Sequence, residues 1–137
     1  MRLISSIPVL AVVIAAYNLF VFGGGGLDAQ SDLFSWVLPS GTEVYFKSGD
    51  VFALAGLVAL FFEILKAARA GAGTIADHML STAAFIVALI EFILLPACGT
   101  VAFFLLTVMA LIDVVAGYTI SILGARRDYS INRDVGF

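Results

Sequence analysis

Four apolar stretches of helical length fill most of this 137-residue chain, at about 3–22, 51–67, 75–95 and 101–123. A helix rises ~1.5 Å per residue, so about 20 residues cover the ~30 Å hydrocarbon core of a bilayer. The stretches are apolar on every face, whereas helices of a soluble bundle have a polar outer face. The sequence therefore predicts an all-α integral membrane protein, a bundle of four transmembrane helices forming one membrane domain.

Composition supports this class and excludes several others. The chain is 62% hydrophobic and only 12% charged, against about 25% charged residues in a typical soluble domain. Its net charge of −3, without a basic patch, makes nucleic acid an unsuitable partner. Cys98 is the only cysteine and His78 the only histidine, so we expect no internal disulfide, no metal site and no cofactor.

The first stretch has a second interpretation. It follows Arg2 and precedes the glycine run 23–26, a layout shared with cleaved signal peptides. We expect it to remain in the mature protein as the first membrane span, followed by a polar loop over 23–50.

That loop contains two β-prone segments, 33–38 and 42–46, separated by a Pro-Ser-Gly turn at 39–41. This pattern predicts a short β-hairpin between the first two helices. A lone hairpin is marginally stable in water, so we expect it to pack on the membrane surface, on a partner or on its own copies. The aromatic candidates for such contacts are Trp36, Tyr45 and Phe46.

Basic residues indicate how the chain is oriented. In the predicted topology Lys47 lies on one side of the membrane, and all other Lys and Arg lie on the opposite side. Cytoplasmic segments carry the excess of basic residues. We therefore expect the protein in the cell (inner) membrane, with both termini in the cytoplasm and the loop 23–50 outside. The cytoplasmic C-terminal segment is a polar tail over 124–137, which composition predicts to be mobile. The cytoplasmic basic residues are Arg2, Lys66, Arg69, Arg126, Arg127 and Arg133.

Three of the apolar stretches each contain a carboxylate: Glu63, Glu91 and Asp113. A charge at mid-membrane costs on the order of 2.5–3.5 kcal/mol, so each acid should face another helix rather than lipid. Small residues on the same helix faces agree with this, because they allow close helix packing. These predicted packing positions are Gly56, Ala59, Ala84, Ala88, Gly117 and Ser121.

Two of the acids have open interpretations. Asp113 lies about midway along its stretch, where it could handle protons or cations, or form a hydrogen bond that only links helices. Glu91 lies near the outer end, level with Tyr17 and Asn18 of the first stretch. It could gate such a pathway or hydrogen-bond to either of these residues.

Glu63 lies near the inner end of the second stretch, level with His78 and one turn from Lys66. We expect it to pair with one of these residues, with a proton-handling role as the alternative. His78 is a better partner for an acid than a metal ligand. Ser81 and Ser121 also lie in spans, and we expect no histidine beside either of them, so the sequence predicts no catalytic residue.

Two classes of function follow. The first is a non-catalytic small membrane protein, either an accessory or assembly subunit of a membrane complex or a self-assembling homo-oligomer. The alternative is a small proton-coupled transporter or channel that uses Asp113 together with Glu91 or Glu63. Both place the lipid bilayer around the chain, and neither requires an enzymatic activity.

Overall fold

The computed structural model describes residues 7–24, 28–70 and 75–134. In this part of the chain three helices are long and apolar enough to cross a membrane, and a fourth apolar helix is shorter. The predicted helical class and the predicted hairpin are both confirmed. In chain order the elements are α1 (Val9–Gly23), β1 (Asp32–Val37), β2 (Glu43–Lys47), α2 (Ser48–Ala70), α3 (Ile75–Leu94), the 3-10 turn η2 (Pro96–Cys98) and α4 (Val101–Asp134).

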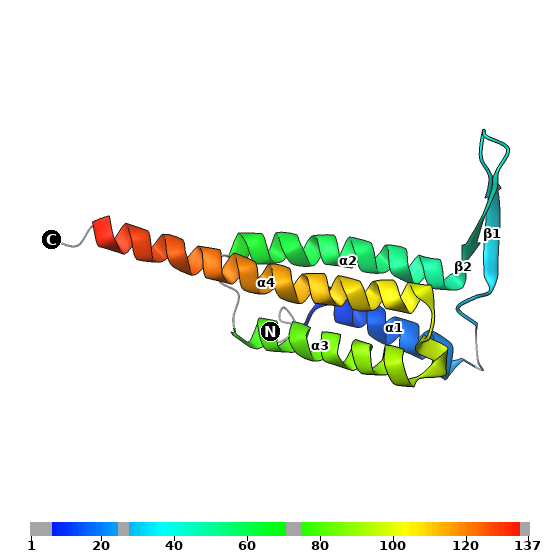
Figure 1. The fold of residues 1–137 in the computed structure, drawn as a ribbon, viewed down its shortest axis with the longest axis horizontal. Helices are drawn as coiled ribbons and strands as arrows, with labels where there is room; N and C mark the ends of the chain where they lie inside the picture. The colour runs from blue at the N-terminus through cyan, green and yellow to red at the C-terminus, as the bar shows by residue number, and fades with distance from the viewer. Residues whose placement is uncertain (1–6, 25–27, 71–74, 135–137) are drawn as a thin grey trace.

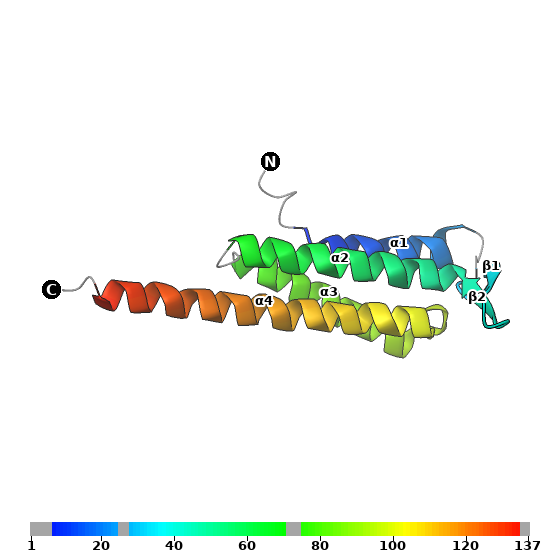
Figure 2. The ribbon, with the colours of Figure 1, turned by 90° about the horizontal axis from the view of Figure 1, so that it is seen from above.

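The four helices lie side by side along a common direction (Figures 1 and 2). α4 packs on both α2 and α3, and α1 packs on α2. α1 and α3 contact each other little, so one seam of the bundle is loosely closed. The hairpin of β1 and β2 lies at one end of the bundle and runs across the helix direction (Figure 1). We call this the hairpin end, and the opposite end the basic end.

The first helix begins later than predicted. The expected span began at residue 3, but α1 begins at Val9, directly after Pro8, and residues 3–6 lie outside the described part. Proline lacks the backbone N–H and fits only the first turn of a helix or the position before it. Pro8 therefore sets the start. The 15 residues of α1 extend about 22 Å at ~1.5 Å per residue, less than the ~30 Å core of a bilayer.

The fourth helix ends later than predicted. The expected span stopped at residue 123, followed by a mobile tail, whereas α4 continues as one helix of 34 residues to Asp134. Gly124 alone does not stop it, because Ala and Arg, which favour helices, follow and no proline does. At ~1.5 Å per residue α4 is about 51 Å long, and its polar end projects beyond the other helices (Figure 1).

The core lies where α1, α2 and α4 meet. Tyr17 is fully buried, with its ring 4.9 Å from that of Phe103 and 5.4 Å from that of Phe52. Leu10 and Leu106 are also buried there. By contrast, large apolar side chains cover much of the outer surface of the helices. This apolar exterior suits a surrounding of lipid.

The predicted small packing positions lie at or near helix contacts. Gly56, Ala59 and Ala88 are buried, and Ala84, Gly117 and Ser121 are half-buried. Gly56 lies so close to the side chain of Leu106 on α4 that an added methyl group would collide with it. α2 and α4 therefore approach each other closely because residue 56 has no side chain.

Candidate functional site

Two groups of polar side chains lie within the bundle, one near each end. We call them the hairpin-end cluster and the basic-end cluster. The hairpin-end cluster consists of Tyr17, Asn18, Glu91, Cys98 and Thr100. The basic-end cluster consists of Glu63, Lys66, His78, Ser81, Asp113 and Ser121.

In the hairpin-end cluster, Glu91 on α3 faces Asn18 on α1. The Asn18 amide nitrogen donates to both carboxylate oxygens, at 2.9 and 2.8 Å. Of the two partners that the sequence offered for Glu91, the structure selects Asn18. Tyr17 instead contacts the start of α4, where its hydroxyl lies 2.8 Å from Oγ1 of Thr100.

Cys98, in the turn η2, is completely buried beside this pair. Its thiol lies 3.7 Å from Oδ1 of Asn18, so the Asn18 amide is held from both sides. Burial, with a smaller contribution from the charge of Glu91, raises the pKa of Cys98 to about 11. The thiolate is the reactive form of cysteine, so Cys98 acts here as a packed, weak hydrogen-bond donor.

In the basic-end cluster, Glu63 on α2 is buried and accepts a hydrogen bond from the backbone N–H of Val9. Val9 is the first residue of α1, where backbone N–H groups lack partners within the helix. A carboxylate is favourable there because the helix dipole is positive at this end. Lys66, one turn along α2, completes the site with its Nζ 3.4 Å from Oε2 of Glu63. Of the two cations offered for Glu63, the structure places Lys66 in contact.

Asp113, in the first half of α4, is buried and hydrogen-bonds to the Ser81 side chain of α3. It also interacts electrostatically with Glu63, Lys66 and His78. From the sequence, Glu63 was predicted near the inner end of its stretch and Asp113 about midway along its own. In the structure Glu63 and Asp113 nevertheless interact electrostatically, because α2 and α4 pack on each other and both run from the hairpin end toward the basic end (Figure 1).

His78 on α3 contacts two residues of α4. Its Nε2 lies 2.6 Å from Oγ of Ser121, and its ring stacks on Tyr118 at 5.0 Å. The expectation that no histidine lies beside Ser121 is therefore wrong. The cause is Gly117, which leaves room for the imidazole: an added methyl group there would lie 3.1 Å from Nδ1. The ring crosses α4 at this glycine and reaches the serine one turn further along.

This contact links helices, and nothing in its geometry requires a reaction. Serine and histidine commonly hydrogen-bond between membrane helices, where few other partners exist. Within the described ranges, no group of three or more His, Cys, Asp or Glu side chains is placed to hold a metal ion. The two clusters can therefore position helices and hold charge.

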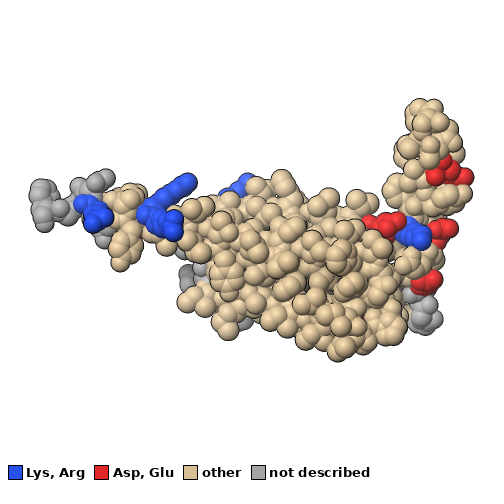
Figure 3. Space-filling model, in the orientation of Figure 1, with Lys and Arg blue, Asp and Glu red and all other residues tan. Residues whose placement is uncertain are grey.

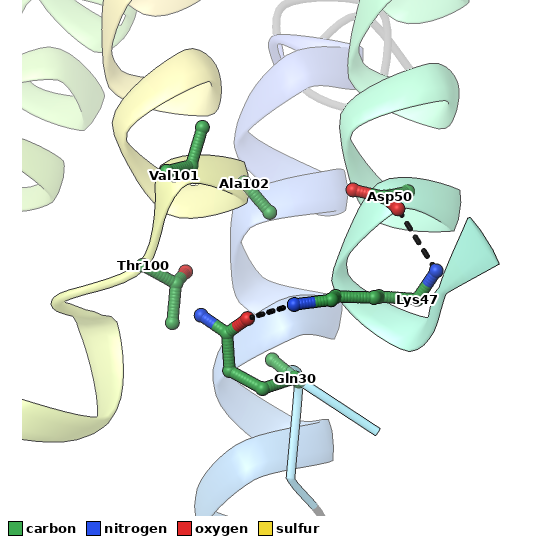
Figure 4. Close-up of a pocket in the computed structure, with 7 residues that line it drawn as sticks. Gln30, Lys47, Asp50, Thr100, Val101 and Ala102 are labelled. Atoms are coloured by element: carbon green, nitrogen blue, oxygen red, sulfur yellow. Dashed lines mark hydrogen bonds between the residues drawn. The ribbon is translucent and has the colours of Figure 1, made fainter. Parts of the chain in front are cut away.

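A small polar cleft of about 230 Å³ opens at the hairpin end, between the loop and the start of α4 (Figure 4). The Lys47 side chain crosses it, with Nζ 3.1 Å from Oε1 of Gln30. The backbone N–H of Lys47 donates to Asp50 at 2.8 Å, at the start of α2. These bonds fasten the hairpin to the bundle, so the cleft's polar groups are already engaged with each other.

A second hollow, of about 340 Å³, is the groove along the loose seam between α1 and α3. Its walls are almost entirely apolar and include several alanines, with Asn18 near the hairpin end. We call it the α1–α3 groove. Ala84 was predicted to lie on a packing face, but the exposure of its neighbours along the groove was not predicted from the sequence. Representative lining residues are Ala11, Ala15, Ala83, Ala84 and Val87.

The three aromatic contact candidates lie on the hairpin. Trp36 is 65% exposed and Tyr45 is 55% exposed, while Phe46 is half-buried. Phe46 stacks on Phe34 with ring centres 4.7 Å apart. Phe34 was not among the predicted contact residues, and the register of β1 and β2 pairs it with Phe46.

Comparisons of this chain with protein-family models, with curated proteins and with solved structures find no match.

Proposed function

We propose that this chain is a non-catalytic subunit of a membrane assembly, which joins other transmembrane helices through the α1–α3 groove. The proposal keeps four membrane crossings. α2, α3 and α4 have the required length and apolarity, and α1 supplies about 22 Å of the predicted first span. A short hydrophobic helix is accommodated by local thinning of the bilayer.

The distribution of charge supports the proposed orientation. Figure 3 shows Lys and Arg gathered at the basic end and along the projecting part of α4, and Asp and Glu gathered at the hairpin end. Lys47 is the one described basic residue at the hairpin end. The positive-inside rule then places the basic end and both termini in the cytoplasm, and the loop 23–50 outside the cell membrane.

The groove is the observation that carries the proposal. On α3 only Ala88 is buried among the residues from Ile75 to Leu94. The groove is long, apolar and lined by alanines such as Ala15 and Ala83, and small residues are what allow another helix to approach closely in a membrane. Its occupant in this proposal is an apolar transmembrane helix, supplied by a second copy or by a different subunit.

The partners of the acids fit the same account. Glu91 is bonded to Asn18, and Glu63 to Lys66 and the start of α1. The contacts with Asn18 and with the start of α1 join two helices, and the contact with Lys66 holds the Glu63 carboxylate within α2. These are structural roles. The bundle thus uses these charges to fix its own shape and leaves an apolar groove for the partner.

Site-specific photo-crosslinking tests this in native membranes. A diazirine-bearing amino acid is placed at Ala83 in the groove or, as a control, at Leu57, which is exposed on α2. We expect position 83 to give one stoichiometric adduct with a defined transmembrane helix, and position 57 to give lipid adducts. Equal labelling at both positions, or lipid adducts alone at position 83, would contradict the proposal.

A second candidate function has one observation in its favour. The basic-end cluster gathers Asp113, Glu63 and His78 around one region of the bundle, as a proton-coupled transporter or channel would require. In proteoliposomes this candidate predicts pH-dependent flux that Asp113→Asn abolishes while the protein remains folded. Absence of flux from the wild-type protein would remove it.

A further inference from the structure

The two faces of the hairpin differ in chemistry. Paired residues of an antiparallel ladder point to the same side, so the register of β1 and β2 assigns each side chain to a face. On one face the Glu43 carboxylate accepts hydrogen bonds from Ser35 at 2.6 Å and from Tyr45 at 2.9 Å. The opposite face is entirely apolar and is called the aromatic face. It consists of Phe34, Trp36, Val44 and Phe46.

The orientation of the hairpin places the aromatic face beside the bundle. The hairpin runs across the helix direction at the end of the bundle (Figure 1). Figure 3 shows acidic side chains of its projecting part on the side that faces away from the helices. On β2 the residues of the polar face, Glu43 and Tyr45, are exposed, and those of the aromatic face are half-buried. We therefore take the aromatic face to point back toward the level at which the helices end. In a membrane that level is the surface of the outer leaflet.

The described part of the chain leaves much of this face exposed. Phe34 is 53% exposed and Trp36 is 65% exposed, although a two-stranded hairpin needs a packed face to be stable. Tryptophan and other aromatic residues concentrate at the membrane–water boundary, where a flat ring can contact both lipid tails and headgroups. A hairpin whose aromatic face lies parallel to the membrane would place its rings at this boundary.

We infer that the aromatic face lies on the outer leaflet of the bilayer that the helices cross, with lipid at the headgroup–acyl boundary as its partner. The inference rests on the proposed membrane placement. Charge agrees with it: hydrogen bonds from Ser35 and Tyr45 lower the pKa of Glu43, so this carboxylate is ionised at neutral pH and faces water. Tyr45, which the sequence suggested as an aromatic contact, lies on this polar face.

Trp36 is the only tryptophan in the chain, so its fluorescence reports the position of the aromatic face directly. The full-length protein is reconstituted at low density into phosphatidylcholine vesicles, and insertion is checked by flotation. Lipids brominated near the headgroup should quench Trp36 several-fold more than lipids brominated near the bilayer centre. Aqueous iodide should quench it little.

A matched variant moves the probe to the other face. In Trp36→Phe/Tyr45→Trp the new indole lies on the polar face, one pair away in the same ladder. We expect the reverse pattern, with strong quenching by iodide and weak quenching by brominated lipid. Similar quenching of the wild-type protein and of this variant would overturn the inference, because it would show that the two faces have the same surroundings.

The outcomes for the wild-type protein separate the possible coverings. Strong iodide quenching of Trp36 in protein that floats with the vesicles overturns the inference and leaves the membrane placement intact. Protection from both iodide and brominated lipid indicates cover by protein and also overturns it. Protein that does not float with the vesicles contradicts the membrane placement and the inference together.

Discussion

The Asn18 amide donates to both carboxylate oxygens of Glu91, at 2.9 and 2.8 Å, and so ties α1 to α3 where these helices otherwise contact each other little. Asn18 also lines the α1–α3 groove. The pair therefore holds the groove together near the hairpin end, while the rest of the seam stays open. The Asn18–Glu91 hydrogen bonds thus help to set the shape of the apolar α1–α3 groove.

Replacing one member of this pair should cost more than replacing both. Asn18→Leu leaves the Glu91 carboxylate without its partner, and we expect a loss of about 1–3 kcal/mol in the free energy of unfolding. Asn18→Leu/Glu91→Leu removes the orphaned charge, and stability should return to within about 1 kcal/mol of wild type. SDS titration of the protein in mild micelles measures both. A double variant less stable than Asn18→Leu would contradict the packing role.

Glu63 should stabilise the start of α1 specifically. Glu63→Ala removes the acceptor for the Val9 N–H, with an expected cost of about 0.5–2 kcal/mol, as for other helix caps. Hydrogen exchange should accelerate in the first turn of α1 and change little in α3. Lys66→Ala is the control. Its side chain is 42% exposed, and exposed ion pairs contribute only about 0.2–1 kcal/mol. Equal effects of the two substitutions would refute the capping role.

Because helices pack closely at Gly56, adding one methyl group there should destabilise the protein more than adding one at an uncrowded glycine. Gly56→Ala pushes against Leu106 on α4, and we expect about 1–3 kcal/mol of destabilisation from overpacking. Gly23→Ala is the matched control, because the nearest atom to its added methyl group, Cδ2 of Leu19, lies 3.9 Å away. Thermal unfolding in detergent should separate the two variants. Equal melting temperatures would show that α2 and α4 are not in close contact there.

Cys98 should resist alkylation in the folded protein. Its pKa is about 11 against an ordinary value of 9.0, so thiolate forms only as the pH approaches 11. Iodoacetamide should react slowly at neutral pH, and unfolding in SDS should restore the pH dependence of an ordinary thiol. A Ser130→Cys substitution in a Cys98→Ser background is the control, because residue 130 is exposed on α4. Equal rates for the two cysteines would contradict the buried thiol.

Most of the fold could be predicted because membrane helices are read from local composition. The segments 51–67 and 75–95 correspond to α2 and α3, and the turn at 39–41 predicts the hairpin. The errors lie at element ends. Pro8 is the sequence signal for the late start of α1. The fourth span was predicted to end at residue 123 because polar residues follow, whereas the helix continues through Gly124, a single glycine that costs only about 1 kcal/mol.

The candidate sites were predicted less completely, because they depend on how helices turn toward each other. Helical spacing placed Glu63, Glu91 and Asp113 on contact faces, and all three do contact other helices. It could not show that His78 would cross α4 at Gly117 to reach Ser121, since this depends on the crossing geometry of two helices. The open groove between α1 and α3 could not be predicted for the same reason, because it also depends on how two helices are placed relative to each other.

Native mass spectrometry after mild detergent extraction of the tagged protein tests the central claim most directly. The account predicts that the chain leaves the membrane in a defined complex, with a stoichiometric second copy or a different membrane subunit. A bulky substitution in the groove, Ala83→Trp, should dissociate that complex while the chain stays folded. A monodisperse monomer, with pH-dependent flux that Asp113→Asn abolishes, would contradict the assembly role and establish transport in its place.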